Sequence, residues 1–305
     1  MLIISTRATV VSMGQLILLV AVLLTAASPG YTQCSDAGIC AVRQPESIVA
    51  GQSSDDRTAS PGNLGLLYRY GTSGSVNDDD KINYHSIELA GQVRLGAATR
   101  VSARLPYRHQ SGAAGSVSGI GDLLILLEQE LADFGAFASY AALGTRLATG
   151  DANADATLPQ AYQPGLGTND LLLGLGLRSE AWSFALGYQL VENTFTDNAL
   201  TPIRRGDDFY VQIGHSRMAG PVALRFDLQG IQRLTTTELR ADDESILEVD
   251  DTDQLQINLG AEGSVPLGRT TDLRLGLAVP LMKRESNIDG LRRALTVWVG
   301  AGLAF

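Results

Sequence analysis

Residues 294–305, the last twelve of the chain, read ALTVWVGAGLAF and carry its clearest structural signal. Every second residue from Leu295 to Phe305 is apolar, whereas the positions between them hold Thr296, Trp298 and small residues. Successive side chains of a β-strand point to opposite faces, so this period of two predicts a strand with one apolar face.

The same alternation recurs along the chain from residue 61 onward. Residues 121–134 are rich in helix-forming residues, but they alternate as well, and we favour a strand over a helix there. Each segment has about the ten residues that a tilted strand needs to cross a bilayer. We predict twelve strands, over residues 61–71, 84–96, 99–108, 120–131, 134–147, 168–178, 182–192, 207–215, 221–231, 253–265, 271–282 and 294–305.

The connections between these segments alternate in length. Long ones are expected at 71–83, 109–119, 148–167, 193–206, 232–252 and 283–293, and short ones at 97–98, 132–133, 179–181, 216–220 and 266–270. An even number of strands, with long loops at one end and short turns at the other, is typical of bacterial outer-membrane barrels. The sequence therefore predicts an all-β fold, a transmembrane antiparallel up-and-down β-barrel of about twelve strands over residues 61–305. A soluble β-sandwich has no reason to sort its loops in this way.

Composition agrees with a barrel and excludes several other classes. Charged residues make up 18% of the 305 residues and hydrophobic ones 45%, and the mean hydropathy is +0.06. These values exclude a polytopic helical membrane protein and intrinsic disorder. A net charge of −10 argues against a nucleic-acid partner, because phosphate contacts need a basic surface.

The N-terminus is typical of an export signal. Arg7 is the only charged residue among the first 33, and the apolar run 16–24 is followed by small residues. We predict a cleaved signal peptide over 1–33; the alternative is a buried first helix. Residues 34–60 then form an N-terminal segment that either stays in the periplasm or plugs the lumen. Cys34 and Cys40 lie in this segment as candidates for a disulfide in an oxidising compartment, with two free thiols as the alternative.

The face opposite the apolar one is polar and mixed in charge. Glycine and alanine fill the positions between the charges, which suits a crowded lumen where opposite charges pair across strands. The lumen-facing candidates are Glu88, Arg94, Arg104, Asp122, Glu128, Asp170, Arg178, Arg225, Asp227, Glu262 and Arg274. The aromatic candidates for the interfacial girdles, or else ordinary strand residues, are Tyr68, Tyr70, Tyr107, Tyr188, Phe209 and Tyr210.

The C-terminal strand also resembles the insertion signal of outer-membrane barrels. It ends in Leu303 and Phe305, an apolar residue and a terminal aromatic one. The resemblance implies recognition by the barrel-assembly machinery, a place in the bacterial outer membrane among its lipids and lipopolysaccharide, and both termini on the periplasmic side.

Three glycine-rich stretches at junctions of loop and strand suggest a family. They are Gly119-Ile-Gly-Asp-Leu123, Ala148-Thr-Gly-Asp151 and Gly165-Leu-Gly-Thr-Asn-Asp-Leu171. This set resembles the outer-membrane family named for the meta-pathway of phenol degradation, which implies a channel for hydrophobic or aromatic molecules. The alternative is that the glycines serve turn geometry and tight packing. Asp122 and Asp170 are then expected to cap turns or to pair with lumen arginines such as Arg104 and Arg178.

We therefore predict an outer-membrane channel that passively admits small solutes, hydrophobic or aromatic ones by the resemblance. The alternative is a non-conducting structural or adhesive barrel that acts through its outer loops. No catalytic residues, cofactor or metal are predicted, since Gly214-His-Ser-Arg-Met218 lacks the closing glycine of a nucleophile elbow and other motifs are absent. The acidic stretch 238–251 is interpreted as a solvated loop rather than a cation site.

Overall fold

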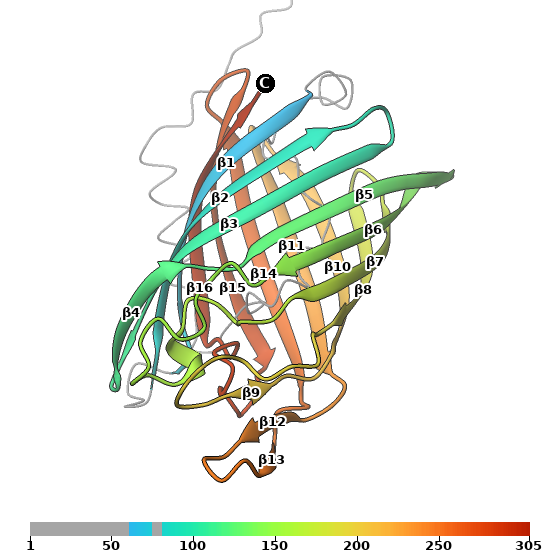
Figure 1. The fold of residues 1–305 in the computed structure, drawn as a ribbon. Helices are drawn as coiled ribbons and strands as arrows, with labels where there is room; N and C mark the ends of the chain where they lie inside the picture. Colours follow the sequence, from blue (N-terminus) through green and yellow to red (C-terminus); the bar gives the residue numbers. More distant parts are fainter. Residues whose placement is uncertain (1–60, 75–80) are drawn as a thin grey trace, which may run out of the picture. The chain divides into compact units, whose positions relative to one another are not determined.

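A computed structural model describes residues 61–74 and 81–305 of the protein. In this part of the chain a single antiparallel sheet of thirteen strands curls round until its two ends meet (Figure 1). The predicted signal peptide, the segment 34–60 and the Cys34–Cys40 pair lie outside the described residues. Among the described residues no helix has the length and apolar character needed to cross a membrane.

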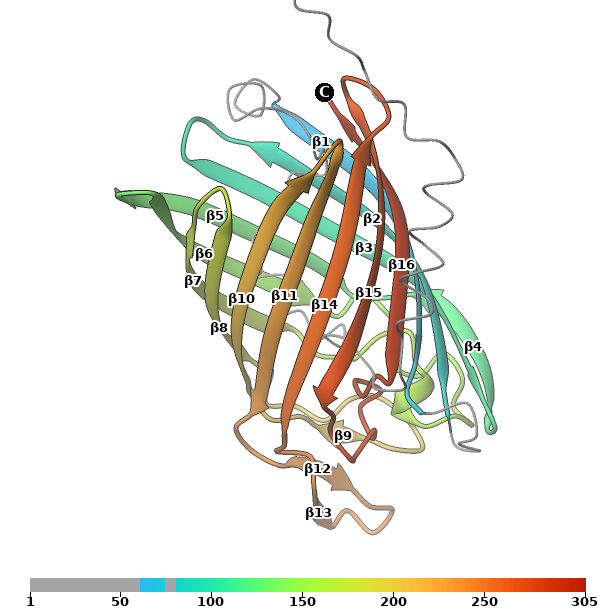
Figure 2. The same ribbon diagram turned by 180° about the vertical axis from the view of Figure 1, so that it is seen from behind.

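Twelve strands form the closed wall, as the alternation predicts. They follow one another in chain order, and β16 pairs with β1 to close the wall. Figure 2 shows the wall of β10, β11, β14, β15 and β16 from behind. The twelve are β1 (Gly62–Thr72), β2 (Asn83–Arg94), β3 (Thr99–Gly112), β5 (Leu123–Phe134), β6 (Phe137–Leu147), β7 (Asp170–Arg178), β8 (Trp182–Leu190), β10 (Asp208–Ala219), β11 (Val222–Arg233), β14 (Leu255–Pro266), β15 (Thr271–Met282) and β16 (Leu295–Ala304).

The thirteenth strand corrects one predicted loop. Residues 109–119 were expected to be a long connection, but β3 continues to Gly112 and turns into β4 (Gly115–Ile120). β4 and β5 pair with successive halves of β3 and are separated only by Gly121 and Asp122. The run GAAGSVSG has the small residues of a loop, but a tight hairpin can also be built from them.

Alternation separates the two faces of the wall. Leu66 and Leu175, on the outward face, are 56% and 58% exposed, whereas the inward Glu128 and Gln212 are 1% and 2% exposed. Exposed leucine, valine or isoleucine side chains lie on every strand of the wall and form an apolar belt, whereas soluble monomers rarely expose large apolar patches. Such a belt fits lipid, in which a closed wall leaves no backbone group unpaired.

The aromatic residues lie mostly on the outward face. Tyr68, Tyr107 and Phe209 are well exposed there, as the girdle prediction requires. Tyr210 contradicts that prediction, because it is fully buried on the inward face of β10 and its hydroxyl donates to Gln212. Tyr210 lies in the inward phase of its strand with Asp208 and Gln212, so the register places it inside.

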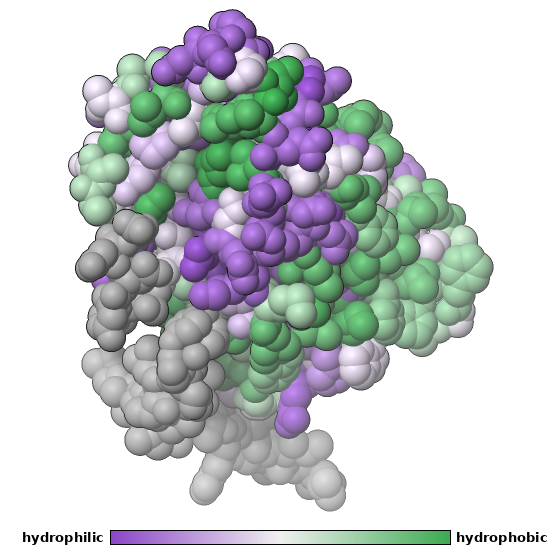
Figure 3. Space-filling view, turned by 90° about the horizontal axis from the view of Figure 1, so that it is seen from below, coloured by the Kyte–Doolittle hydropathy of each residue, from purple (hydrophilic) through white to green (hydrophobic). Residues whose placement is uncertain are grey.

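The two ends of the barrel differ. The short turns lie at one end of the barrel, together with the start of β1 and the end of β16. There Phe305 N–H donates to Gly62 O at 3.0 Å, and Gly62 N–H donates to Phe305 O at 3.2 Å. The opposite end, which we call the long-loop end, carries the long connections and a small sheet of β9 (Ile203–Arg204), β12 (Thr237–Arg240) and β13 (Ile246–Val249). A 3-10 helix, η2 (Gln160–Tyr162), lies in the connection before β7. Figure 3 views this end and shows hydrophilic residues gathered at its centre, beside a hydrophobic wall.

Candidate functional site: a charged lumen with a closed mouth

Pairs of opposite charge line the lumen between β3, β5 and β7. Arg100 of β3 lies directly opposite Glu128 of β5, and their side chains pair at 2.8 Å. Arg178 reaches the same Glu128 oxygen from β7 at 2.7 Å and also pairs with Glu130. Two arginines therefore share two glutamates across three strands.

A second set of pairs lies on other strands of the wall. Arg225 pairs with Asp227 at 2.9 Å within β11, and Arg274 of β15 pairs with Asp272 at 2.8 Å and with Glu262 at 3.9 Å. Glu88 of β2 lies 3.7 Å from Arg69. The lumen is thus lined with fixed charges of both signs.

The eleven predicted lumen residues all occupy inward positions and are buried or half-buried. Arg94 and Arg104, on β2 and β3, are half-buried at inward positions. The position of these side chains follows from strand periodicity, since each lies an even number of residues from a buried neighbour.

The three glycine-rich stretches meet at Asp122. Its carboxylate accepts backbone N–H bonds from Gly150 at 3.2 Å and from Leu166 at 2.8 Å. Gly150 also packs against backbone, because a Cβ there would lie 2.8 Å from the carbonyl carbon of Gly121 and from Cα of Gly165. Asp122 therefore fastens the connection 148–169 to the interruption between β4 and β5.

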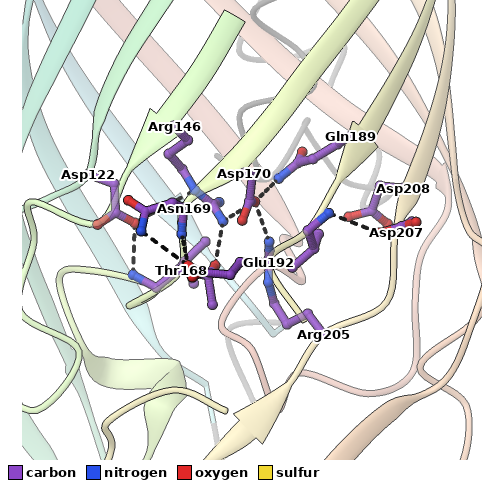
Figure 4. A network of polar contacts seen from close by, with 12 residues as sticks. Asp122, Arg146, Thr168, Asn169, Asp170, Gln189, Glu192, Arg205, Asp207 and Asp208 are labelled. Carbon is purple, nitrogen blue, oxygen red and sulfur yellow. Dashed lines mark hydrogen bonds and ion pairs between the residues drawn. The ribbon is translucent and has the colours of Figure 1, made fainter. Parts of the chain in front are cut away.

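Eight buried charged residues lie across the barrel at the long-loop end, and we call them the mouth layer (Figure 4 shows part of it). Four are arginines and four are aspartates, so their charges balance. Their side chains are 5% exposed or less. The members are Asp122, Arg146, Asp170, Arg205, Asp208, Arg233, Arg284 and Asp289.

The pairs in this layer join strands to loops. Asp170, at the start of β7, binds Arg146 of β6 and, at 2.9 Å, Arg205 of the connection 191–207. Asp208, at the start of β10, lies 3.2 Å from Arg233 of β11 and 3.0 Å from Arg284 of the connection 283–294. Charges buried this deeply are stable only when they are paired, so the layer holds the loops in the mouth.

Asp289 joins the layer from the same connection. One carboxylate oxygen accepts a hydrogen bond from Arg233 Nη1 at 2.7 Å, and the other accepts one from the N–H of Leu291 at 3.0 Å. Burial alone would raise the pKa of Asp289, but attraction to Arg233, Arg284 and Arg205 prevails and lowers it to about 2. Asp289 is therefore charged at any physiological pH.

Arg205 experiences the opposite balance. Burial lowers the pKa of its guanidinium to about 10, and repulsion from Arg146 acts in the same direction, while Asp170 opposes both. Arg205 is still a cation at neutral pH, but its carboxylate partner does not fully compensate the cost of burial.

Apolar loop residues complete the closure. All residues from Gln160 to Leu166 are buried, and Leu166 and Leu291 join the cluster that lines the inner wall with Leu172, Tyr210 and Ile231. Gly290 has a φ of +69°, and a Cβ there would lie 2.8 Å from Ala161 O, so the two connections touch. The mouth is closed by contact between two loops above a layer of ion pairs.

Sequence reasoning found only two of the eight mouth residues, Asp122 and Asp170. It expected them to cap turns or to pair with lumen arginines such as Arg104 and Arg178. Asp122 does accept two backbone N–H bonds, and the ion pairs run to Arg146 and Arg205, because both aspartates lie near the long-loop end. Arg146 and Asp208 lie in the inward phase of predicted strands, so alternation could have found them. Arg205, Arg284 and Asp289 lie in connections, where no period gives a direction.

Comparison with known proteins establishes the class of fold. No protein-family model matches the chain, and no curated protein matches it. An outer membrane channel from Pseudomonas putida F1 superposes with a TM-score of 0.61 at 14% identity, over 86% of this chain and 99% of that chain. The NanC porin superposes with a TM-score of 0.50 at 5% identity, over 80% and 100%. At these identities the similarity is one of fold: the chain is a β-barrel of the outer-membrane type.

Proposed function

We propose that the protein is a passive channel for small solutes in a bacterial outer membrane. The observation that carries the proposal is the barrel itself, with an apolar outward belt and an inner wall lined by paired charges. Buried charges are costly, and a wall of this kind is useful where it surrounds a path for polar molecules. The similarity in fold to an outer membrane channel supports the same function.

The chemistry of the lumen favours small polar or charged solutes. Arginines and carboxylates from most strands face inward, and they offer hydrogen bonds rather than an apolar surface. The resemblance to the phenol-degradation family implies hydrophobic or aromatic solutes instead. An aromatic acid would satisfy both expectations, so aromatic carboxylates belong in the test panel.

The proposed location in an outer membrane implies an orientation for the barrel. The short-turn end and both chain termini would face the periplasm, and the long-loop end with its mouth layer would face outward. The barrel-assembly machinery would recognise the terminal Leu303 and Phe305. The outward apolar belt would contact lipid and lipopolysaccharide.

Swelling of liposomes tests the channel directly. Purified protein is reconstituted with and without residues 34–60, and swelling is followed in glycine, acetate and benzoate. We expect swelling in at least one small solute, and faster swelling after deletion if residues 34–60 plug the lumen. No swelling with either protein contradicts the channel.

The second candidate is a non-conducting barrel that acts through its outer loops. The closed mouth and the small sheet of β9, β12 and β13 beyond it favour this reading. The same experiment separates the two, because this candidate predicts no swelling under any condition.

A further inference from the structure

The carboxylate of Asp289 occupies a buried site formed by arginine side chains, which we call the seat of Asp289. Arg233 donates to it at 2.7 Å, and the positive charges of Arg284 and Arg205 act on it as well. Arg233 is itself fully buried and is also held by Asp208 and by the hydroxyl of Thr237 at 3.1 Å. The arginine side of the seat is therefore fixed by the wall.

The carboxylate side of the seat is carried by a connection between strands, because Asp289 belongs to the residues 283–294 that join β15 to β16. That connection meets the rest of the mouth through Arg284 and Leu291 as well, and Asn287 Nδ2 donates to Tyr84 OH at 3.2 Å. Asp170 and Asp208, by contrast, lie on strands paired with both neighbours. Asp289 is the one aspartate of the mouth layer carried by a long connection.

Unused hydrogen-bond donors lie on the two other arginines whose charges act on Asp289. Among the described residues, Nε and Nη1 of Arg205 have no partner, and the same two atoms of Arg284 have none. Both side chains are almost fully buried, at 0% and 3% exposed. A buried donor without an acceptor is unfavourable, so these atoms can donate to a further oxygen ligand.

We propose that the seat of Asp289 is a binding site for a small carboxylate solute, which exchanges with the Asp289 side chain against Arg233 and Arg205. The proposal rests on the channel function and specifies its solute class. In the closed state the loop carboxylate fills the site. A free carboxylate takes its place when the connection 283–294 moves out, and the unused donors of Arg205 give it a further partner.

Tethering explains why the seat is filled by the chain at rest. A group held on a short loop acts at an effective concentration in the millimolar range or higher. In the wild type a free carboxylate displaces the Asp289 side chain only above that concentration range. Once the Asp289 charge is removed, the free carboxylate binds without this competitor. Removal of the Asp289 charge should therefore raise the apparent affinity for acetate at least tenfold.

The test is a titration of the purified full chain in micelles with acetate, followed by saturation-transfer NMR of the acetate methyl group. Asp289→Asn is compared with wild type and with Glu285→Gln, which removes the same charge from an exposed position of the same connection. Acetamide, the neutral isostere, is the control ligand. A variant in which a Gly-Ser linker replaces residues 286–291 repeats the test if Asp289→Asn fails to fold.

We expect the apparent affinity for acetate to rise at least tenfold in Asp289→Asn and to stay unchanged in Glu285→Gln. Acetamide should not bind, and the rise in affinity should be lost when Arg205→Gln is added to Asp289→Asn. Equal acetate binding in wild type and Asp289→Asn overturns the proposal. So does a gain that also appears in Glu285→Gln or that survives Arg205→Gln. Since binding is measured without transport, acetate binding without liposome swelling would refute the channel and leave the site in place.

Discussion

Replacement of Asp122 by alanine should loosen the connection 148–169 and destabilise the barrel. The substitution removes the acceptor of two backbone donors, Leu166 N–H at 2.8 Å in a buried site and Gly150 N–H at 3.2 Å in a partly buried one. A buried donor left unsatisfied costs about 1–3 kcal/mol. Arg146 lies 3.9 Å away and keeps Asp170 as its partner, so its contribution to the loss is small. The expected decrease in the free energy of unfolding is about 3 kcal/mol.

Reversible urea unfolding in lipid vesicles, followed by tryptophan fluorescence, measures this decrease. Asp133→Ala, an exposed aspartate near the far end of β5, is the matched control and should change stability by less than about 0.5 kcal/mol. The connection 148–169 should also become sensitive to protease in Asp122→Ala alone. A decrease below about 1 kcal/mol, with the connection still protected, would refute the role assigned to Asp122.

Three further predictions follow from other parts of the barrel. Leu175→Arg, on the outward face of β7, should lower the free energy of unfolding in vesicles by about 2–4 kcal/mol. Leu200→Arg, equally exposed but in a connection, should leave it almost unchanged. Equal decreases in the two variants would show that the belt does not contact lipid. Gly150→Ala should cost at least about 2 kcal/mol, because its Cβ would meet only backbone atoms, while Gly230→Ala, with open space around it, serves as the neutral comparison in the same urea titration. Because the pKa of Asp289 falls from 3.8 to about 2 on folding, its contribution of about 2 kcal/mol should be complete above about pH 5 and should disappear as the pH falls toward 2. The stability difference between wild type and Asp289→Asn, measured from pH 7 to pH 2, should shrink in that window, and a difference that stays constant to pH 2 would contradict the assignment.

Strand periodicity made most of the wall predictable. Each strand must present an apolar face to one side, so residues such as Leu175 and Glu128 reveal their faces from their spacing alone. The hairpin of β3 and β4 was missed, because Ser116 and Ser118 alternate with small residues and show no apolar face. Tyr210 was assigned to the wrong face because aromatic residue type was given more weight than the phase of its strand.

The mouth could be predicted only in part. Asp122 and Asp170 stood out because glycines flank them at junctions of loop and strand, yet nothing in the sequence shows that Gly150 and Leu166 both return to Asp122. The contacts of Arg284 and Asp289 join segments up to 76 residues apart, and loop residues have no period that would give their direction. Such pairings depend on how the closed wall brings the connections together.

The conductance of single channels in planar bilayers tests the central claim most directly, when wild type is compared with a variant in which a short Gly-Ser linker replaces residues 284–293. This change removes Arg284, Asp289 and Leu291 from the mouth but leaves every wall strand intact. We predict that the variant conducts several-fold more than wild type and remains open for longer. The absence of conductance in both proteins, with both folded, would contradict a channel closed by its own loops.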